Sequence, residues 1–276
     1  MPPTAILLVL SAAVLHASWN LLAKRARDPF AFLWLAMALA LVWLAPLSLA
    51  FEPRSISQAI VPLVVSGVVH GAYFATLGEA YREGELSTVY PIARGLGVGL
   101  APLVAIAIEG AYPSALASIG IATIVIAILS LARGGHRGSR RGTWLAIATG
   151  PLIAIYSIVD HHGVARANPI PYLAATNVGA LFVSAPFAWR RRAALAEEWR
   201  TNRRALALAA TTSLTAYLLV LFAFRLAEAA YVVAMRETSI VVATILARML
   251  LAESVTRTRA AAALAITIGA GILALS

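Results

Sequence analysis

Long apolar stretches of similar length recur along the whole chain, and short segments with charges, prolines and glycines separate them. A helix needs roughly 17 to 25 mostly apolar residues to cross a bilayer. These stretches are continuous runs of Ala, Leu, Val and Ile, without the alternation that the lumen of a β-barrel imposes. The pattern therefore predicts an all-α integral membrane protein with ten transmembrane helices. The expected spans are residues 4–23, 29–51, 56–81, 86–108, 113–132, 143–162, 171–189, 205–224, 229–251 and 260–276.

The composition is that of a chain surrounded by lipid. Of the 276 residues, 61% are apolar and 12% are charged, and the mean hydropathy is +0.84, whereas soluble domains carry about 25% charged residues. This surplus of apolar surface excludes intrinsic disorder. The lack of cysteine excludes a disulfide-stapled secreted domain. Residues 1–5 contain no Lys or Arg, so we expect the first stretch to be a retained span and not a cleaved signal peptide.

Basic residues are distributed unevenly among the connections between the expected spans. Even-numbered connections contain Arg54, Arg166 and Arg225. The other basic residues of the connections lie in or beside odd-numbered ones. Because short loops rich in Lys and Arg stay in the cytoplasm, the odd connections are predicted to face inward and both termini outward. The net charge of +10 then needs no nucleic-acid partner, since basic loops contact anionic lipid headgroups. The basic residues of the odd connections are Lys24, Arg25, Arg27, Arg82, Arg133, Arg137, Arg140, Arg141, Arg190, Arg191, Arg192, Arg200, Arg203, Arg204, Arg257 and Arg259.

The basic connection 133–142 divides the chain into two five-span halves, residues 1–132 and 143–276. An aromatic-Arg-x-x-Glu pattern follows the third span of each half, from Tyr81 to Glu85 in the first and from Phe224 to Glu228 in the second. An odd number of spans per half reverses the direction in which the second half enters the membrane. The pattern therefore predicts an inverted repeat with a substrate site between the halves.

Two arginines, Arg94 and Arg236, lie well inside the fourth and ninth spans. An Arg at the centre of a transmembrane helix costs roughly 2.5 to 3.5 kcal/mol on insertion scales, so it normally faces a cavity or a partner. Snorkelling of the side chain towards the interface is the alternative. Glu237 follows Arg236 directly, and consecutive helical residues point about 100° apart. Glu237 is therefore expected to pair with a residue of another helix.

Histidine and aromatic residues recur at helical spacing in the same spans. His16 and Asn20 share one face of the first span, and His70 precedes Tyr73 and Phe74 by one turn in the third. Simple packing also explains an aromatic stripe, but a histidine within it favours a water-exposed face. The predicted substrate-binding residues are His16, Trp19, Asn20, His70, Tyr73, Phe74, Tyr90, Arg94, Tyr156, Tyr217, Arg236 and Glu237.

The end of the sixth span carries Asp160, His161 and His162. Adjacent imidazoles diverge on a helix, so we interpret this group as an interfacial polar cap rather than a metal site. The sequence contains no Ser-His-Asp, HExxH or paired-carboxylate constellation, which disfavours an enzyme. We expect no cofactor and no metal.

The ten spans in two halves, the HASWN stretch at 16–20 that leads to Lys24, and the YSIVDHHG stretch at 156–163 together resemble the drug/metabolite transporter superfamily. The resemblance is to its ten-helix EamA-type branch, and there to the bacterial amino-acid exporters of the YddG type. It implies a bacterial inner-membrane protein with alternating access and a central cavity lined mainly by spans 1, 3, 4, 6, 8 and 9. Small four-helix members expel cationic drugs through a Glu in their first span, whereas here that span contains His16 and no acid.

The sequence thus predicts export of small zwitterionic metabolites, such as aromatic and other neutral amino acids. An arginine would hold the substrate carboxylate and Glu237 its ammonium. The alternative within transport is proton-coupled efflux of hydrophobic cations, with Glu237 or a histidine as the titrating group. A membrane-embedded enzyme and a scaffold without transport are alternatives from other classes. The expected partners are a small-molecule substrate and membrane lipid, without nucleic acid, and a monomer is compatible with the sequence.

Overall fold

The computed structural model describes residues 1–51, 54–109, 114–133, 139–227 and 229–275, and this part of the chain forms thirteen helical segments. Their bounds are α1 (Pro3–Arg25), α2 (Pro29–Ser48), α3 (Arg54–Ser57), α4 (Ile60–Glu83), α5 (Leu86–Glu109), α6 (Ala115–Arg133), α7 (Arg140–Val164), α8 (Pro169–Arg190), α9 (Arg192–Thr201), α10 (Arg203–Phe224), α11 (Ala229–Arg236), α12 (Thr238–Leu250) and α13 (Arg257–Ala274).

Each expected span contains helix, and six helices are long and apolar enough to cross a membrane. They are α1, α2, α4, α7, α8 and α10, and α6 contains a shorter apolar helix, Ala115–Leu131. The chain is therefore an all-helical, multi-pass membrane protein. Some predicted features lie outside the described residues: the start of the fifth span at 113, the end of the tenth at 276, Glu228 of the repeated pattern and Arg137 of the basic connection.

The prediction of one continuous helix over 229–251 was wrong. Helix α11 ends at Arg236 and α12 begins at Thr238. At the break the Glu237 amide donates to the Ala234 carbonyl at 3.0 Å, and the Ile240 amide donates to the Glu237 carbonyl at 2.9 Å. These hydrogen bonds span three residues, as in a 3₁₀ turn. The ninth expected span is thus discontinuous at its two charged residues.

The structure differs from the prediction in two connections as well. Helix α9 lies where the sequence predicted only a basic connection, because Ala, Leu, Glu and Arg are strong helix formers. The connection expected at 133–142 is shorter than predicted, since its last residues 140–142 belong to α7, and its residues 134–138 lie outside the described part of the chain.

Several helix starts follow from local capping chemistry that is visible in the sequence. The Asp28 carboxylate accepts a hydrogen bond from the Ala31 amide at 3.0 Å, and Pro29 occupies the first turn of α2. Asn168 caps α8 in the same way, ahead of Pro169. A side-chain oxygen at the N-cap satisfies an amide that has no partner within the helix, and proline there loses no hydrogen bond.

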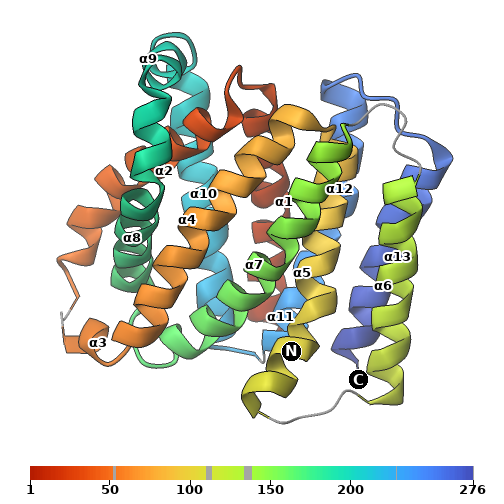
Figure 1. Ribbon diagram of the computed structural model, residues 1–276. Coiled ribbons are helices and arrows are strands. Elements are labelled where there is room, and N and C mark those ends of the chain that lie inside the picture. The colour runs from red at the N-terminus through yellow and green to blue at the C-terminus, as the bar shows by residue number, and fades with distance from the viewer. Residues whose placement is uncertain (52–53, 110–113, 134–138, 228, 276) are drawn as a thin grey trace.

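Both chain termini lie at the end of the molecule opposite α9 (Figure 1). The helices of the first half pack on those of the second: α1 lies against α10 and α12, α2 against α8 and α10, α4 against α7 and α8, α5 against α7, and α6 against α13. In the described part of the chain, the helices of the two halves thus pack against each other. A site at the centre of the molecule is therefore bounded by both halves.

Glycines allow some of these helices to approach closely. A Cβ atom at Gly78 of α4 would lie 2.6 Å from the Phe30 Cα of α2, and a Cβ at Gly67 of α4 would lie 3.1 Å from the Gly179 Cα of α8. Small residues at such crossings permit the backbone contacts that hold membrane helices together.

Candidate functional site

A small central cavity lies between α1, α2 and α4 on one side and α7, α8 and α10 on the other. It has a volume of about 50 Å³, which is room for a few water molecules at roughly 10–15 Å³ each. A larger solute therefore requires the helices to separate. The lining residues are His16, Trp19, Met37, Ala40, His70, Tyr73, Phe74, Tyr156, Leu173, Asn177, Ser213, Leu214 and Tyr217.

The cavity wall is a cluster of aromatic and histidine rings. His70 lies 4.3 Å from Tyr156 and 5.4 Å from Tyr217 between ring centroids, and Trp19 lies 6.3 Å from Phe74. One end of each Tyr, Trp and His ring is polar, so the wall combines apolar area with hydrogen-bonding groups. The predicted residues that line the cavity are His16, Trp19, His70, Tyr73, Phe74, Tyr156 and Tyr217.

The expected set of lining helices is only partly correct. Residues of α2 and α8, the second and seventh spans, contribute to the cavity, whereas the fourth and ninth spans contribute none of its lining residues. Tyr90 on α5 instead donates to Ser239 on α12 at 2.8 Å, and its ring lies 6.3 Å from that of His16. The fourth and ninth spans therefore pack together behind the cavity wall.

Arg94 and Glu237 form a buried ion pair. Arg94 Nη2 donates to Glu237 Oε1 at 2.6 Å, and the side chains are 2% and 1% exposed. Glu237 thus pairs with another helix, as the 100° divergence from Arg236 predicted. The pair bridges α5 of the first half and the break between α11 and α12 of the second. Neither residue lines the cavity.

Arg236 is also buried, at 2% exposure, so snorkelling to the surface does not explain either intramembrane arginine. Its guanidinium carbon lies 5.9 Å from the Tyr217 ring centroid, within the range of a cation–π contact. Nη1 and Nη2 of Arg236 have no hydrogen-bond partner among the described residues. Behind the cavity wall there is thus a cation whose donors are available to an anion.

Asn20, by contrast, has a structural role. Its amide donates to the His16 carbonyl at 2.7 Å, and its Oδ1 accepts from the Tyr81 hydroxyl at 2.5 Å. Lys24 continues this connection by donating to the Tyr81 carbonyl at 2.5 Å. Asn20 is fully buried and fixes α1 against α4 rather than lining the cavity.

Asp160 is the residue that the sequence interpretation missed. It is 0% exposed rather than part of an interfacial cap, and its carboxylate accepts hydrogen bonds from the hydroxyls of Tyr172 at 2.8 Å and of Tyr217. Only its position one turn beyond Tyr156 on the same helix face could have indicated this. Within the described ranges no group of three or more His, Asp or Glu is arranged to hold a metal ion.

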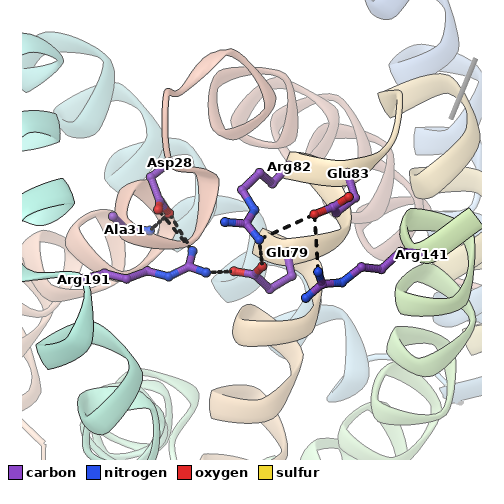
Figure 2. A network of polar contacts seen from close by, with 7 residues as sticks. All are labelled: Asp28, Ala31, Glu79, Arg82, Glu83, Arg141 and Arg191. Carbon is purple, nitrogen blue, oxygen red and sulfur yellow. Dashed lines mark hydrogen bonds and ion pairs between the residues drawn. The ribbon is translucent and has the colours of Figure 1, made fainter. Parts of the chain in front are cut away.

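Ion pairs close the end of the molecule at which α9 lies (Figure 2). Arg191 contacts both carboxylate oxygens of Asp28 at 3.1 Å and also forms an ion pair with Glu79. Arg82 adds a 2.8 Å contact to Glu79. Because Arg191 follows α8 and its partners belong to the first half, these contacts tie the two halves together at this end.

A second group of contacts joins the halves beside the start of α5. The amides of Leu86 and Ser87 donate to the two carboxylate oxygens of Glu253 at 2.8 and 2.9 Å. Arg259 of α13 forms an ion pair with Glu85. A carboxylate at a helix N-terminus interacts favourably with the helix dipole. Polar contacts thus connect the two halves at this end as well.

The fold and site are those of a polytopic membrane protein with a mainly apolar, aromatic-lined cavity between two groups of helices. Residues 140–275, in the second half of the chain, match the model of the EamA-like transporter family. This part of the chain is thus similar to a family of transporters.

A comparison with solved structures found 26 matching chains. One crystal structure has a TM-score of 0.69 and 18% sequence identity, and the alignment covers 100% of this chain and 98% of that chain. At this identity the likeness shows the fold alone. A comparison with curated proteins found no match.

Proposed function

We propose that this protein exports small zwitterionic metabolites, aromatic and other neutral amino acids first among them, by alternating access around the central cavity. The observation that carries the proposal is the position of Arg236, a buried cation with two nitrogens lacking partners in the described structure, behind an aromatic and histidine wall. The aromatic wall suits an apolar or aromatic side chain, and the guanidinium suits a carboxylate, which it binds in bidentate geometry.

Arg94 has a different role in this proposal. Its Nη2 is paired with Glu237 at 2.6 Å, although its Nε and Nη1 also lack hydrogen-bond partners in the described structure. Arg236 makes no ion pair among the described residues, so we assign the substrate carboxylate to Arg236. The pair fixes the broken ninth span against α5 and so positions Arg236. Discontinuous helices near the membrane midplane are a recurrent feature of substrate sites in transporters, and here the break carries the buried side chains of Arg236 and Glu237.

The packing pattern supports the ten-span, inverted-repeat arrangement with halves 1–132 and 143–276. Exchanging α1, α2, α4, α5 and α6 with α7, α8, α10, α11–α12 and α13 converts the α1–α10 contact into α7–α4 and the α1–α12 contact into α7–α5, and all four are present. The α2–α8 and α6–α13 contacts convert into themselves. The cavity-lining helices also form exchangeable sets, three from each half.

The proposed orientation places the α9 end in the cytoplasm of a bacterium and both termini outside the inner membrane. The basic residues of α9 and of the ion pairs around Arg191 gather at that end, which is the side that short Lys- and Arg-rich loops prefer. Opening this end would admit the substrate, and opening the opposite end would release it. We propose a monomer as the working unit, since the cavity is bounded by one chain.

The test is a screen of purified protein in liposomes with labelled amino acids, nucleosides, sugars and the hydrophobic cation tetraphenylphosphonium, with and without pH and voltage gradients. We expect saturable flux of phenylalanine, tryptophan or leucine that empty liposomes lack. Flux of tetraphenylphosphonium without any amino-acid flux would replace the proposal with its alternative, efflux of hydrophobic cations. Flux of none of these solutes would contradict both.

A further inference from the structure

One buried carboxylate beside the cavity has no part in the proposed function so far. Asp160 of α7 is 0% exposed and lies one turn beyond Tyr156, which lines the cavity. The hydroxyls of Tyr172 and Tyr217 donate to its two oxygens. In the described part of the chain, no Arg or Lys lies within ion-pair distance of this carboxylate.

An ionised carboxylate in a low-dielectric interior is costly unless a cation neutralises it. The two tyrosine hydroxyls supply hydrogen bonds but no positive charge. Glu237, the other buried acid near the cavity, is already neutralised by Arg94 at 2.6 Å. Of the two acids, Asp160 is therefore the one that a cationic ligand stabilises more.

Tyr217 connects Asp160 with Arg236. Its hydroxyl donates to the Asp160 carboxylate, its ring lies 5.9 Å from the Arg236 guanidinium carbon, and the residue itself lines the cavity. A negative group thus contacts the hydroxyl of this cavity-wall side chain, and a positive group lies near its ring. Opposite charges at two places behind one cavity wall match the ammonium and the carboxylate of a zwitterion.

We propose that Asp160 binds the ammonium group of the substrate, and that the ammonium replaces the Tyr217 hydroxyl on the carboxylate. This inference rests on the proposed function and assigns the ammonium to Asp160 instead of Glu237. The exchange releases the Tyr217 side chain from α7, so binding of an amine loosens a contact between α7 and α10. Asp160 then makes a primary amine a requirement for tight binding.

The experiment measures binding to the purified full chain by fluorescence of its tryptophans, of which Trp19 lines the cavity. The ligands are phenylalanine, phenethylamine, which lacks the carboxylate, and 3-phenylpropionate, which lacks the amine. Asp160→Asn should weaken the binding of phenylalanine and of phenethylamine by at least about tenfold, which is the effect of losing a charge-assisted hydrogen bond. The affinity of Asp160→Asn for 3-phenylpropionate should stay within about twofold of the wild-type affinity.

Two further variants make the result specific. Asp160→Glu keeps the charge and should retain more phenethylamine binding than Asp160→Asn. Glu197→Gln removes a carboxylate of α9 that pairs with Arg27 and Arg200 at the surface, and it should bind all three ligands as wild type does. Monodisperse elution of each variant verifies that it is folded.

Unchanged phenethylamine binding by Asp160→Asn would overturn the assignment, and so would an equal loss of phenethylamine and 3-phenylpropionate, which indicates a structural role. If Asp160→Glu lost as much phenethylamine binding as Asp160→Asn, that result would also count against the assignment of the ammonium to Asp160. If wild type binds phenethylamine through Asp160 but neither binds nor moves phenylalanine, the proposed function fails and the Asp160 site stands. Binding of none of the three ligands by wild type would overturn both.

Discussion

Arg94 on α5 forms a buried ion pair with Glu237 at the break between α11 and α12, with 2.6 Å between Nη2 and Oε1. The two residues are far apart in the sequence and belong to different halves of the chain. Each residue neutralises the charge of the other, because an unpaired charge in the membrane interior is energetically costly. The pair thus fixes the geometry of the broken ninth span, and Arg236 with it.

Removing one partner of this pair should destabilise the protein strongly. Arg94→Ala or Glu237→Ala leaves an uncompensated buried charge, which costs about 3–5 kcal/mol. The double variant Arg94→Met with Glu237→Leu removes both charges and should recover much of the loss. Thermal unfolding in detergent measures this, and a double variant less stable than both single ones would contradict it.

The contacts of Arg191 should control access from the α9 end. Arg191→Gln removes its ion pairs with Asp28 and Glu79, and partly exposed pairs contribute about 0.2–1 kcal/mol each. If both contributions are lost, the population of molecules open at this end should rise by about two- to thirtyfold.

The measurement uses the absence of native cysteine. Ser213→Cys places a thiol in the cavity wall, and an impermeant maleimide applied on the α9 side should label it faster in Arg191→Gln. Arg200→Gln is the control, because Arg200 pairs with Glu197 of the same helix, α9, and this ion pair does not connect the two halves of the chain. Equal labelling rates in all three backgrounds would argue against a gate here.

Gly78 should tolerate no side chain. A Cβ there would lie 2.6 Å from the Phe30 Cα, a backbone atom that cannot give way without moving α2. Gly78→Ala should therefore cost about 1–3 kcal/mol, as overpacked sites do. In Gly271→Ala the new Cβ meets nothing within 4 Å, so this variant should be at least as stable as wild type. Similar unfolding temperatures for both variants would contradict the α2–α4 contact.

Much of the fold could be predicted because it depends on local properties of the sequence. Apolar stretches of helical length gave the helices, and Asp28 and Asn168 marked the starts of α2 and α8 through their capping hydrogen bonds. The break at Glu237 could not be predicted. Glu237 pairs there with Arg94, whose position in space depends on how the two halves pack.

The site was predictable in part for the same reason. His70, Tyr73 and Phe74 share a helix face, and that face does line the cavity. Asp160 was interpreted as an interfacial residue because of its two histidine neighbours in sequence, whereas its burial depends on the Tyr172 and Tyr217 hydroxyls of other helices. The positions of Tyr90 and Asn20 behind the wall likewise depend on partners in other helices, Ser239 and Tyr81.

The central claim is that Arg236 holds the substrate carboxylate, and phenylalanine counterflow in liposomes tests it most directly. Arg248, exposed on α12, provides the matched control. Wild type and Arg248→Gln should show equal, saturable counterflow, and Arg236→Gln should reduce it by at least about tenfold. Equal counterflow in all three proteins, or none in wild type, would contradict the claim.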